Sequence, residues 1–252
     1  MCLILFSYNT HPTYKLIVAA NRDEFYERPT APAHFWKDNS MILAGRDLKA
    51  MGTWMGVSTT GRFAALTNYR DPMEDTAGKR SRGDLVSYFL NTSISSKQYM
   101  ERIAMERRKY PGFNFIAYDS NKLFYYSNIE NKIKQLESGI YGVSNHLLDT
   151  EWPKVTRGKE GLARISNQDT DSMVEDLFML LQNTDPVPDQ LLPTTGVSLE
   201  WERRLSPLFI ISGEGYGTRC STVLLMTDKE IQYIERTYST SGVSDQNYTI
   251  KR

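Results

Sequence analysis

Cysteine is scarce in this sequence, and the positive and negative charges of the chain are equal in number. Only Cys2 and Cys220 are cysteines among the 252 residues, and lysine plus arginine and aspartate plus glutamate total 30 each. Two cysteines do not make a disulfide framework, which favours a reducing compartment. A net charge of zero gives no reason to expect nucleic acid or an anionic membrane as a partner.

Long apolar runs are also missing. No run reaches the ~18 apolar residues of a membrane span, and the run 3–6 is far shorter than the core of a signal peptide. We therefore predict a soluble cytoplasmic protein. Because no internal repeat or change of composition marks a linker, we expect a single domain over residues 1–252.

The motifs of common metal and cofactor sites are absent as well. The chain has no Walker lysine motif, no paired-cysteine zinc spacing, no His-Glu-x-x-His and no nucleophile-elbow sequence. The glycines of 213–217 do not lead from a strand into a helix with the spacing that binds phosphate. His11, His34 and His146 are too dispersed to suggest a metal site. The sequence predicts no metal and no cofactor.

Strand patterns dominate what is present, and helical patterns come in two blocks. Apolar runs separated by turn residues predict paired strands at 2–8 with 15–20, 52–58 with 62–68, 114–118 with 122–127, 133–136 with 140–144, and 219–226 with 230–236. Apolar periodicity predicts helices at 83–91, 95–109, 152–165, 172–182 and 199–205. This order, without strict βαβ units, predicts an α+β fold of antiparallel sheets flanked by helices.

Caps and loops fix the boundaries of these elements. Ser95 is the expected cap of the second helix, and Thr170 or Asp171 that of the fourth. Residues 28–32 contain two prolines and should be a loop, because proline interrupts a strand. The charged segment 71–82 and the proline-rich segment 185–196 are also predicted to be loops, and the latter could cover a cleft.

The first predicted hairpin places a cysteine near the chain start beside polar residues. If Tyr8 pairs with Lys15, the antiparallel ladder brings Cys2 opposite Asn21. A slip of one residue brings Arg22 opposite the thiol instead. The sequence leaves both registers open.

Cys2 is the candidate nucleophile. Removal of Met1 would give Cys2 a free α-amine, which titrates at about 7.7–8.0 and can act as the general base for the thiol. Nearby cations would favour the thiolate, the reactive form. The alternative is a buried, inert cysteine in an apolar first strand, which is a common place for this residue type.

Several sequence blocks resemble those of a known family. They are Met-Cys at 1–2, AANRDEF at 19–25, GTWMGVS at 52–58, AALTNY at 64–69, YGVSN at 141–145 and GYGTR at 215–219. In type and order these blocks resemble the NRDE family, also called the transport and Golgi organisation protein 2 family. Eukaryotic members of that family are linked to haem trafficking and lipid metabolism.

The layout is also similar to N-terminal-nucleophile hydrolases of the bile-salt hydrolase and penicillin acylase type. This resemblance implies a four-layer α-β-β-α sandwich of two mainly antiparallel sheets. It also implies a catalytic set at the matching positions of this chain, namely Cys2, Arg22, Asp23, Asn68, Asn145 and Arg219. Those hydrolases separate the early arginine and aspartate by two residues, whereas Arg22 and Asp23 are adjacent and should face opposite sides of a strand.

The chemistry that the resemblance implies is acyl transfer. Cys2 would attack an amide or thioester of a small amphiphilic substrate, and Asn68 or Asn145 would donate to the oxyanion. The asparagines could instead cap turns, and Arg22 could belong to a structural ion-pair network. On the same scaffold, the alternative function is a carrier that binds haem or an acyl-coenzyme A-like ligand without catalysis.

Overall fold

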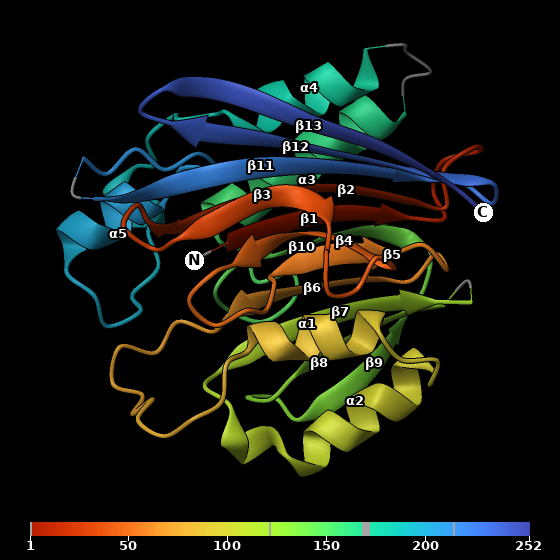
Figure 1. Cartoon of the computed structure of the whole chain (residues 1–252). Coiled ribbons are helices and arrows are strands. Elements are labelled where there is room, and N and C mark those ends of the chain that lie inside the picture. Colours follow the sequence, from red (N-terminus) through yellow and green to blue (C-terminus); the bar gives the residue numbers. More distant parts are fainter. Residues whose placement is uncertain (1, 121, 168–171, 214) are drawn as a thin grey trace.

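Two antiparallel sheets lie face to face in the computed structural model, which describes residues 2–120, 122–167, 172–213 and 215–252 (Figure 1). The first sheet has six strands, in the order β10 (Gly139–Val143), β1 (Cys2–Tyr8), β2 (Leu16–Phe25), β11 (Tyr216–Met226), β12 (Glu230–Ser239) and β13 (Gly242–Lys251). The second has seven, in the order β3 (Thr30–Phe35), β4 (Ile42–Asp47), β5 (Met55–Ser58), β6 (Phe63–Asn68), β7 (Phe113–Asp119), β8 (Lys122–Ser127) and β9 (Lys132–Leu136).

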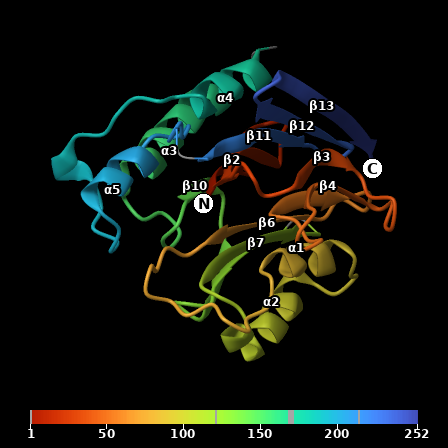
Figure 2. The same cartoon turned by 60° about the vertical axis from the view of Figure 1, so that its left-hand side comes forward.

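Helices cover the outer face of each sheet (Figures 1 and 2). On the second sheet these are α1 (Gly83–Leu90) and α2 (Ser96–Met105), and on the first sheet α3 (Pro153–Ser166) and α4 (Met173–Leu181). The short helix α5 (Leu199–Leu205) follows at one end of the layer formed by α3 and α4 (Figure 2). The predicted four-layer α-β-β-α sandwich is therefore confirmed. No helix within the described ranges is long and apolar enough to cross a bilayer.

Apolar cores separate the layers, and β1 contributes to two of them. Leu3 and Leu5 face α3 and α4, whereas Ile4 and Phe6 face the second sheet. Because both faces of β1 are covered, its sequence is an almost continuous apolar run instead of an alternation of apolar and polar residues.

The first hairpin adopts the second of the two registers that the sequence allows. Cys2 pairs with Arg22, so the pairing with Asn21 is wrong. The same register continues into the turn, where the Asn9 N–H donates to the Lys15 carbonyl at 2.9 Å, so Lys15 lies opposite Asn9 and not opposite Tyr8.

The predicted loop at 28–32 is wrong in part, because β3 begins at Thr30 and contains Pro32. This strand is at the edge of its sheet, and its register shifts between Ala31 and His34. Edge strands and bulges are the places where a sheet tolerates proline, since no ladder hydrogen bond is lost there.

The predicted hairpin of 133–136 with 140–144 is also wrong. β9 pairs with β8 in the second sheet and β10 pairs with β1 in the first, so the chain crosses between sheets at this point. β13 was not predicted, because its exposed, polar sequence lacks the apolar alternation of a strand. Ser172 is the N-cap of α4, whereas Thr170 and Asp171 lie outside the described residues.

Gly52 lies against the start of α1 and fixes the segment that leads into β5. A Cβ atom at Gly52 would lie 2.6 Å from the carbonyl carbon of Gly83, and the Thr53 N–H donates to the Gly83 carbonyl at 3.3 Å. Two backbone segments meet here without room for a side chain.

We expect Gly52→Ala to lower the free energy of unfolding by about 1–3 kcal/mol, because the added methyl group must push two backbone segments apart. A glycine-to-alanine change without a clash would instead raise it by about 0.4–1 kcal/mol. Chemical denaturation measures the difference. The exposed change Ser40→Ala is the control and should stay within about 0.5 kcal/mol of the parent protein.

Candidate functional site

Cys2 is the first residue of β1 and lies at the end of the space between the two sheets. Its side chain is buried and shares the inner face with Arg22, its partner on β2. The Ser144 hydroxyl donates to the Cys2 carbonyl at 3.0 Å and ties the start of β1 to the segment after β10. The thiol is therefore held by both neighbouring strands.

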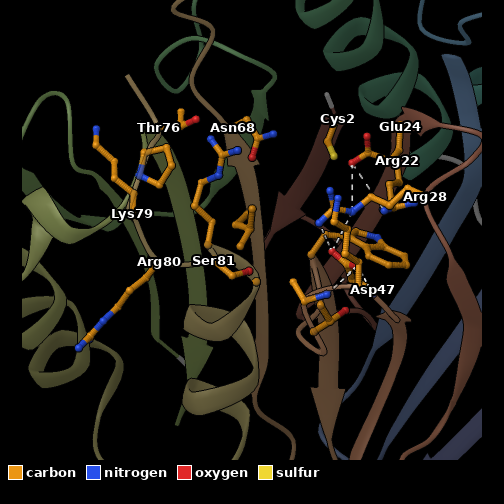
Figure 3. A pocket seen from close by; sticks show the side chains of 18 of the residues that line it. Cys2, Arg22, Glu24, Arg28, Asp47, Asn68, Thr76, Lys79, Arg80 and Ser81 are labelled. Carbon is orange, nitrogen blue, oxygen red and sulfur yellow. Dashed lines mark hydrogen bonds and ion pairs between the residues drawn. The ribbon is translucent and has the colours of Figure 1, made fainter. Parts of the chain in front are cut away.

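A cavity of about 590 Å³ opens at this position (Figure 3). It is lined by both sheets and by the segment that precedes α1. In Figure 3, Cys2, Arg22 and Arg28 lie together on one side, and Thr76 and Lys79 lie across from them. The cavity is large enough for a small-molecule ligand.

Arg22 is a buried cation that keeps an unused hydrogen-bond donor in this cavity. Only 5% of its surface is exposed, and its Cζ atom lies 4.4 Å from the centre of the Trp54 ring. Its Nη2 atom is 3.8 Å from Glu24 Oε2, whereas Nη1 has no hydrogen-bond partner among the described residues. A buried donor without a partner is costly, so a ligand oxygen that reached Nη1 would stabilise the site.

The surroundings of Cys2 keep its thiol protonated. Burial is the largest influence and raises the pKa of the Cys2 thiol, and the charge of Asp23 raises it further. The Arg22 cation and the Asp23 backbone N–H act in the opposite direction. Since the net effect is upward, the thiol needs a base to become a nucleophile.

Asp23 also borders the cavity, but its carboxylate points to the other face of β2. Its Oδ1 atom accepts a hydrogen bond from the Thr218 hydroxyl at 2.7 Å. Burial raises the pKa of the Asp23 carboxyl, and the largest opposing influence is the charge of the Lys154 ammonium. The expectation that Arg22 and Asp23 face opposite sides is confirmed.

Two asparagines of the predicted set meet at the wall of the cavity. Asn68, the last residue of β6, lines it, and Asn145 is fully buried behind. The Asn145 amide donates to the Asn68 carbonyl at 2.9 Å, and the Ser144 hydroxyl lies 3.2 Å from Asn145 Oδ1. Asn68 is thus placed to meet a ligand, while Asn145 positions Asn68.

Arg219 does not join the other predicted site residues. β11 has a bulge between Thr218 and Cys220, which pair with Asp23 and Arg22, so Arg219 is the extra residue. Its Nη1 atom donates to the carbonyls of the turn after β2, namely those of Phe25, Tyr26 and Arg28, at 2.9, 3.2 and 3.1 Å. It lines a separate cavity of about 400 Å³ with Tyr26, Phe209 and Tyr238.

The sequence did not reveal the cationic character of the first cavity. Its lining holds six basic residues, Arg22, Arg28, Lys49, Lys79, Arg80 and Arg82, against three acidic ones, Asp23, Glu24 and Asp47. Three of the six come from the segment predicted only as an exposed loop, 71–82. Their run of basic residues was the available signal, but only the fold shows that they face a cavity. Lys79 and Arg80 pair with Glu74 and Glu106, which lie outside the lining, at 2.6 and 3.1 Å. Lys49 and Arg82 form no ion pair among the described residues, and their charge favours a ligand with an acidic group.

Glu235 is a buried acid next to this region. Its Oε1 atom accepts from the Ala33 N–H at 2.7 Å, and Oε2 has no partner among the described residues. Burial raises the pKa of the Glu235 carboxyl to about 7. Glu235 pairs with Thr222 on β11, which is two residues from Cys220 and faces the same side of the sheet. Within the described residues, no group of three or more His, Cys, Asp and Glu side chains is arranged to hold a metal.

We expect Glu235→Gln to flatten the pH dependence of stability. Glu235 retains its proton in the folded protein between pH 4.5, its ordinary pKa, and about pH 7, so the folded state binds more protons than the unfolded state there. Stability therefore falls as pH rises through this window. Unfolding at pH 5 and pH 8 should show a difference that is smaller in the variant by about 2–3 kcal/mol. Glu230→Gln, at the half-buried start of the same strand, should keep the parent difference, because its pKa is lowered and it is ionised throughout this window.

We expect Arg219→Gln to lower stability by about 1–2 kcal/mol, because three carbonyls lose a charged donor. Thermal unfolding measures the change, with the exposed Arg102→Gln as the control. An unchanged melting temperature would show that this arginine does not stabilise the turn.

Comparison with known proteins places the chain among relatives of similar length. A family model described as Transport and Golgi organisation 2 matches residues 1–240. The human Transport and Golgi organization protein 2 homolog is 37% identical over 268 residues, which cover 97% of this chain and 95% of that protein. The Drosophila melanogaster Transport and Golgi organization protein 2 is 29% identical over 265 residues, which cover 94% of this chain and 92% of that protein.

A solved structure supports the fold. The Caenorhabditis elegans ortholog of N-acylethanolamine-hydrolyzing acid amidase superposes with a TM-score of 0.55 at 10% sequence identity, covering 89% of this chain and 92% of that one. At this identity the likeness concerns the fold alone.

Proposed function

The chain belongs to the Transport and Golgi organisation 2 family, and we propose that it is an N-terminal cysteine hydrolase or acyltransferase. The substrate would be an amide or thioester of a small amphiphilic molecule. One observation carries the proposal: Cys2 lies directly across from Arg22, whose buried Nη1 atom lacks a partner among the described residues, in a cavity that Asn68 also lines.

The reaction begins with activation of the thiol. Burial raises the pKa of the Cys2 thiol, so a resting thiolate is not the nucleophile. Once Met1 is removed, the α-amine of Cys2 takes the thiol proton as the sulfur attacks the substrate carbonyl carbon. Asp23 would orient this amine, and one residue would supply both nucleophile and base.

The oxyanion that forms on the substrate carbonyl needs a donor. The Asn68 side chain is the proposed donor, held in place by the Asn145 amide on its carbonyl. When the intermediate collapses, the C–N or C–S bond breaks and the leaving amine or thiol takes the proton from the α-amine. The acyl group stays on Cys2 as a thioester until water or another acceptor removes it.

The lining of the cavity indicates what substrate it would accept. Trp54, Leu66 and Pro111 supply apolar surface, and the surplus of basic residues would attract a carboxylate or another acidic group. An amphiphile with an acidic head satisfies both. The structural relative is an ortholog of an acid amidase that hydrolyses N-acylethanolamines, so an amide is the substrate class that this likeness suggests.

A carrier for haem or an acyl-coenzyme A-like ligand is the second candidate. The protonated thiol favours binding without catalysis, because without a base the cavity would bind a ligand and not transform it. No histidine is among the described residues that line the cavity, so Cys2 would be the ligand of haem iron, and its thiol would have to lose the proton to bind the metal. For either function we propose a small-molecule ligand, no nucleic acid and a cytoplasmic location.

We expect Cys2→Ser to lower acyl release at least 100-fold in a screen of amides and thioesters, because a serine hydroxyl is a much weaker nucleophile than a thiol at neutral pH. Cys220→Ser is a matched control: Cys220 flanks Arg22 on its other side, is equally buried, and should not be needed.

Unchanged turnover in Cys2→Ser would rule out the thiol as the nucleophile. A haem titration then tests the carrier function. A Soret shift at micromolar haem that is lost in Cys2→Ala but kept in His34→Ala would establish binding through the cavity. Without a shift, the haem carrier is excluded.

A further inference from the structure

Two buried ion pairs flank β6, the strand that ends at Asn68. Before the strand, Arg62 Nη1 lies 3.6 Å from Asp119 Oδ2, and the two side chains are 11% and 8% exposed. After the strand, Arg70 Nη1 lies 2.9 Å from Glu202 Oε2, and these side chains are 7% and 4% exposed. Losing one partner would leave a buried charge without compensation, so each side chain is confined to the geometry that keeps its pair.

Glu202 belongs to α5 and anchors Arg70 from a distant part of the chain. Its Oε1 atom accepts from the Thr195 N–H at 2.9 Å and from the Thr195 hydroxyl at 2.6 Å, so the segment before α5 fixes the carboxylate. The Arg70 Cζ atom also lies 4.8 Å from the centre of the Trp152 ring, at the start of α3. None of the residues 192–206 is among the described residues that line the cavity of Cys2. Glu202 can therefore act on the reaction only through other residues.

The backbone of Arg70 leads from this ion pair to the asparagines of the site. The Arg70 N–H donates to the Asn145 carbonyl at 2.7 Å, and the Asn145 amide donates to the Asn68 carbonyl at 2.9 Å. Asn145 is thus joined to the segment 68–70 by two hydrogen bonds, one through its main chain and one through its side chain. A displacement of Arg70 would loosen both and move Asn68.

We propose that Glu202 is a positioning residue, which acts through Arg70 to fix Asn68, the oxyanion donor of the proposed reaction. This inference rests on the proposed function. The fixed reference is Cys2, whose carbonyl accepts from the Ser144 hydroxyl at 3.0 Å. The residue after Ser144 is the one that holds Asn68, so the donor and the nucleophile are attached to the same short segment.

A displaced donor lowers the rate of the reaction without weakening substrate binding. The oxyanion forms only when the sulfur attacks, so the bond from Asn68 is made in the transition state. The change Glu202→Gln disturbs this arrangement because it replaces one acceptor oxygen by an amide that donates. Whichever oxygen is replaced, the new amide faces a donor, which is Arg70 on one side and the Thr195 N–H on the other.

The first measurement follows the segment 68–70 without reference to catalysis. In ¹⁵N-labelled protein, NMR gives the hydrogen-exchange rate of the Arg70 N–H, divided by that of the β7 amides to remove changes in global stability. We expect Glu202→Gln to raise this ratio at least tenfold, because the N–H loses its hold on the Asn145 carbonyl. Asp119→Asn, the matched change in the ion pair before β6, should leave the ratio unchanged. Thr195→Val removes the hydroxyl that donates to Glu202, and should raise the ratio at least threefold should Glu202→Gln fold poorly.

The second measurement is steady-state kinetics on the amide or thioester that the parent protein turns over fastest. We expect Glu202→Gln to lower kcat at least tenfold and to change KM less than threefold, whereas Asp119→Asn should keep kcat within twofold. Glu202→Gln combined with Asn68→Ala should be no slower than Asn68→Ala alone, since the glutamate acts through this asparagine. A purely structural glutamate would add its loss to that of Asn68→Ala.

The outcomes separate the two proposals. An unchanged exchange ratio at Arg70 in both Glu202→Gln and Thr195→Val overturns the role of Glu202, whatever the chain catalyses. A raised ratio with an unaltered kcat, in a protein that Cys2→Ser inactivates, overturns it too, as does a loss that adds to that of Asn68→Ala. If Cys2→Ser stays active, the proposed function fails, and the role of Glu202 in positioning an oxyanion donor fails with it.

Discussion

The pairing of Cys2 with Arg22 across β1 and β2 is the constraint on which the site depends. A helical layer covers one face of these strands and the second sheet covers the other, so a shift of one residue would exchange the contents of two cores. The register is therefore fixed by the whole sandwich. In this register the thiol lies beside a buried guanidinium, and the adjacent carboxylate of Asp23 points to the opposite face, where it accepts a hydrogen bond from the Thr218 hydroxyl.

Several polar groups of this region are buried without a hydrogen-bond partner or an opposite charge that fully offsets the cost of burial. Arg22 keeps an unpaired donor, Glu235 an unpaired acceptor, and the thiol of Cys2 has a raised pKa. Such groups reduce stability, because a buried polar atom without a partner costs about 1–3 kcal/mol. Perturbed and unpaired groups gather at functional sites, and here they adjoin a cavity. A ligand with an acidic group or a developing oxyanion would supply the acceptor that Arg22 lacks.

The sequence predicted the fold well where periodicity carries the information. The buried run at 2–8 and the helices of the two outer layers are local patterns. Features that depend on contacts between distant parts of the chain could not be predicted from the sequence. The packing of both faces of β1 decides the register, and the bulge in β11 turns Arg219 away from the thiol. Only the packing of the segment 71–82 makes its basic residues line a cavity. Glu202 gave no signal, because a glutamate in the first turn of a helix reads as an exposed residue.

The state of the chain N-terminus tests the account most directly. The intact mass of protein purified without an N-terminal tag, followed by labelling with iodoacetamide at neutral pH, reports whether Met1 is gone and how fast each cysteine reacts. The account predicts loss of Met1 and modification of Cys2 well ahead of Cys220, since only Cys2 would have its own amine as a base. Retained Met1 together with a Cys2 as slow as Cys220 would contradict self-activated catalysis and leave the cavity as a site for binding alone.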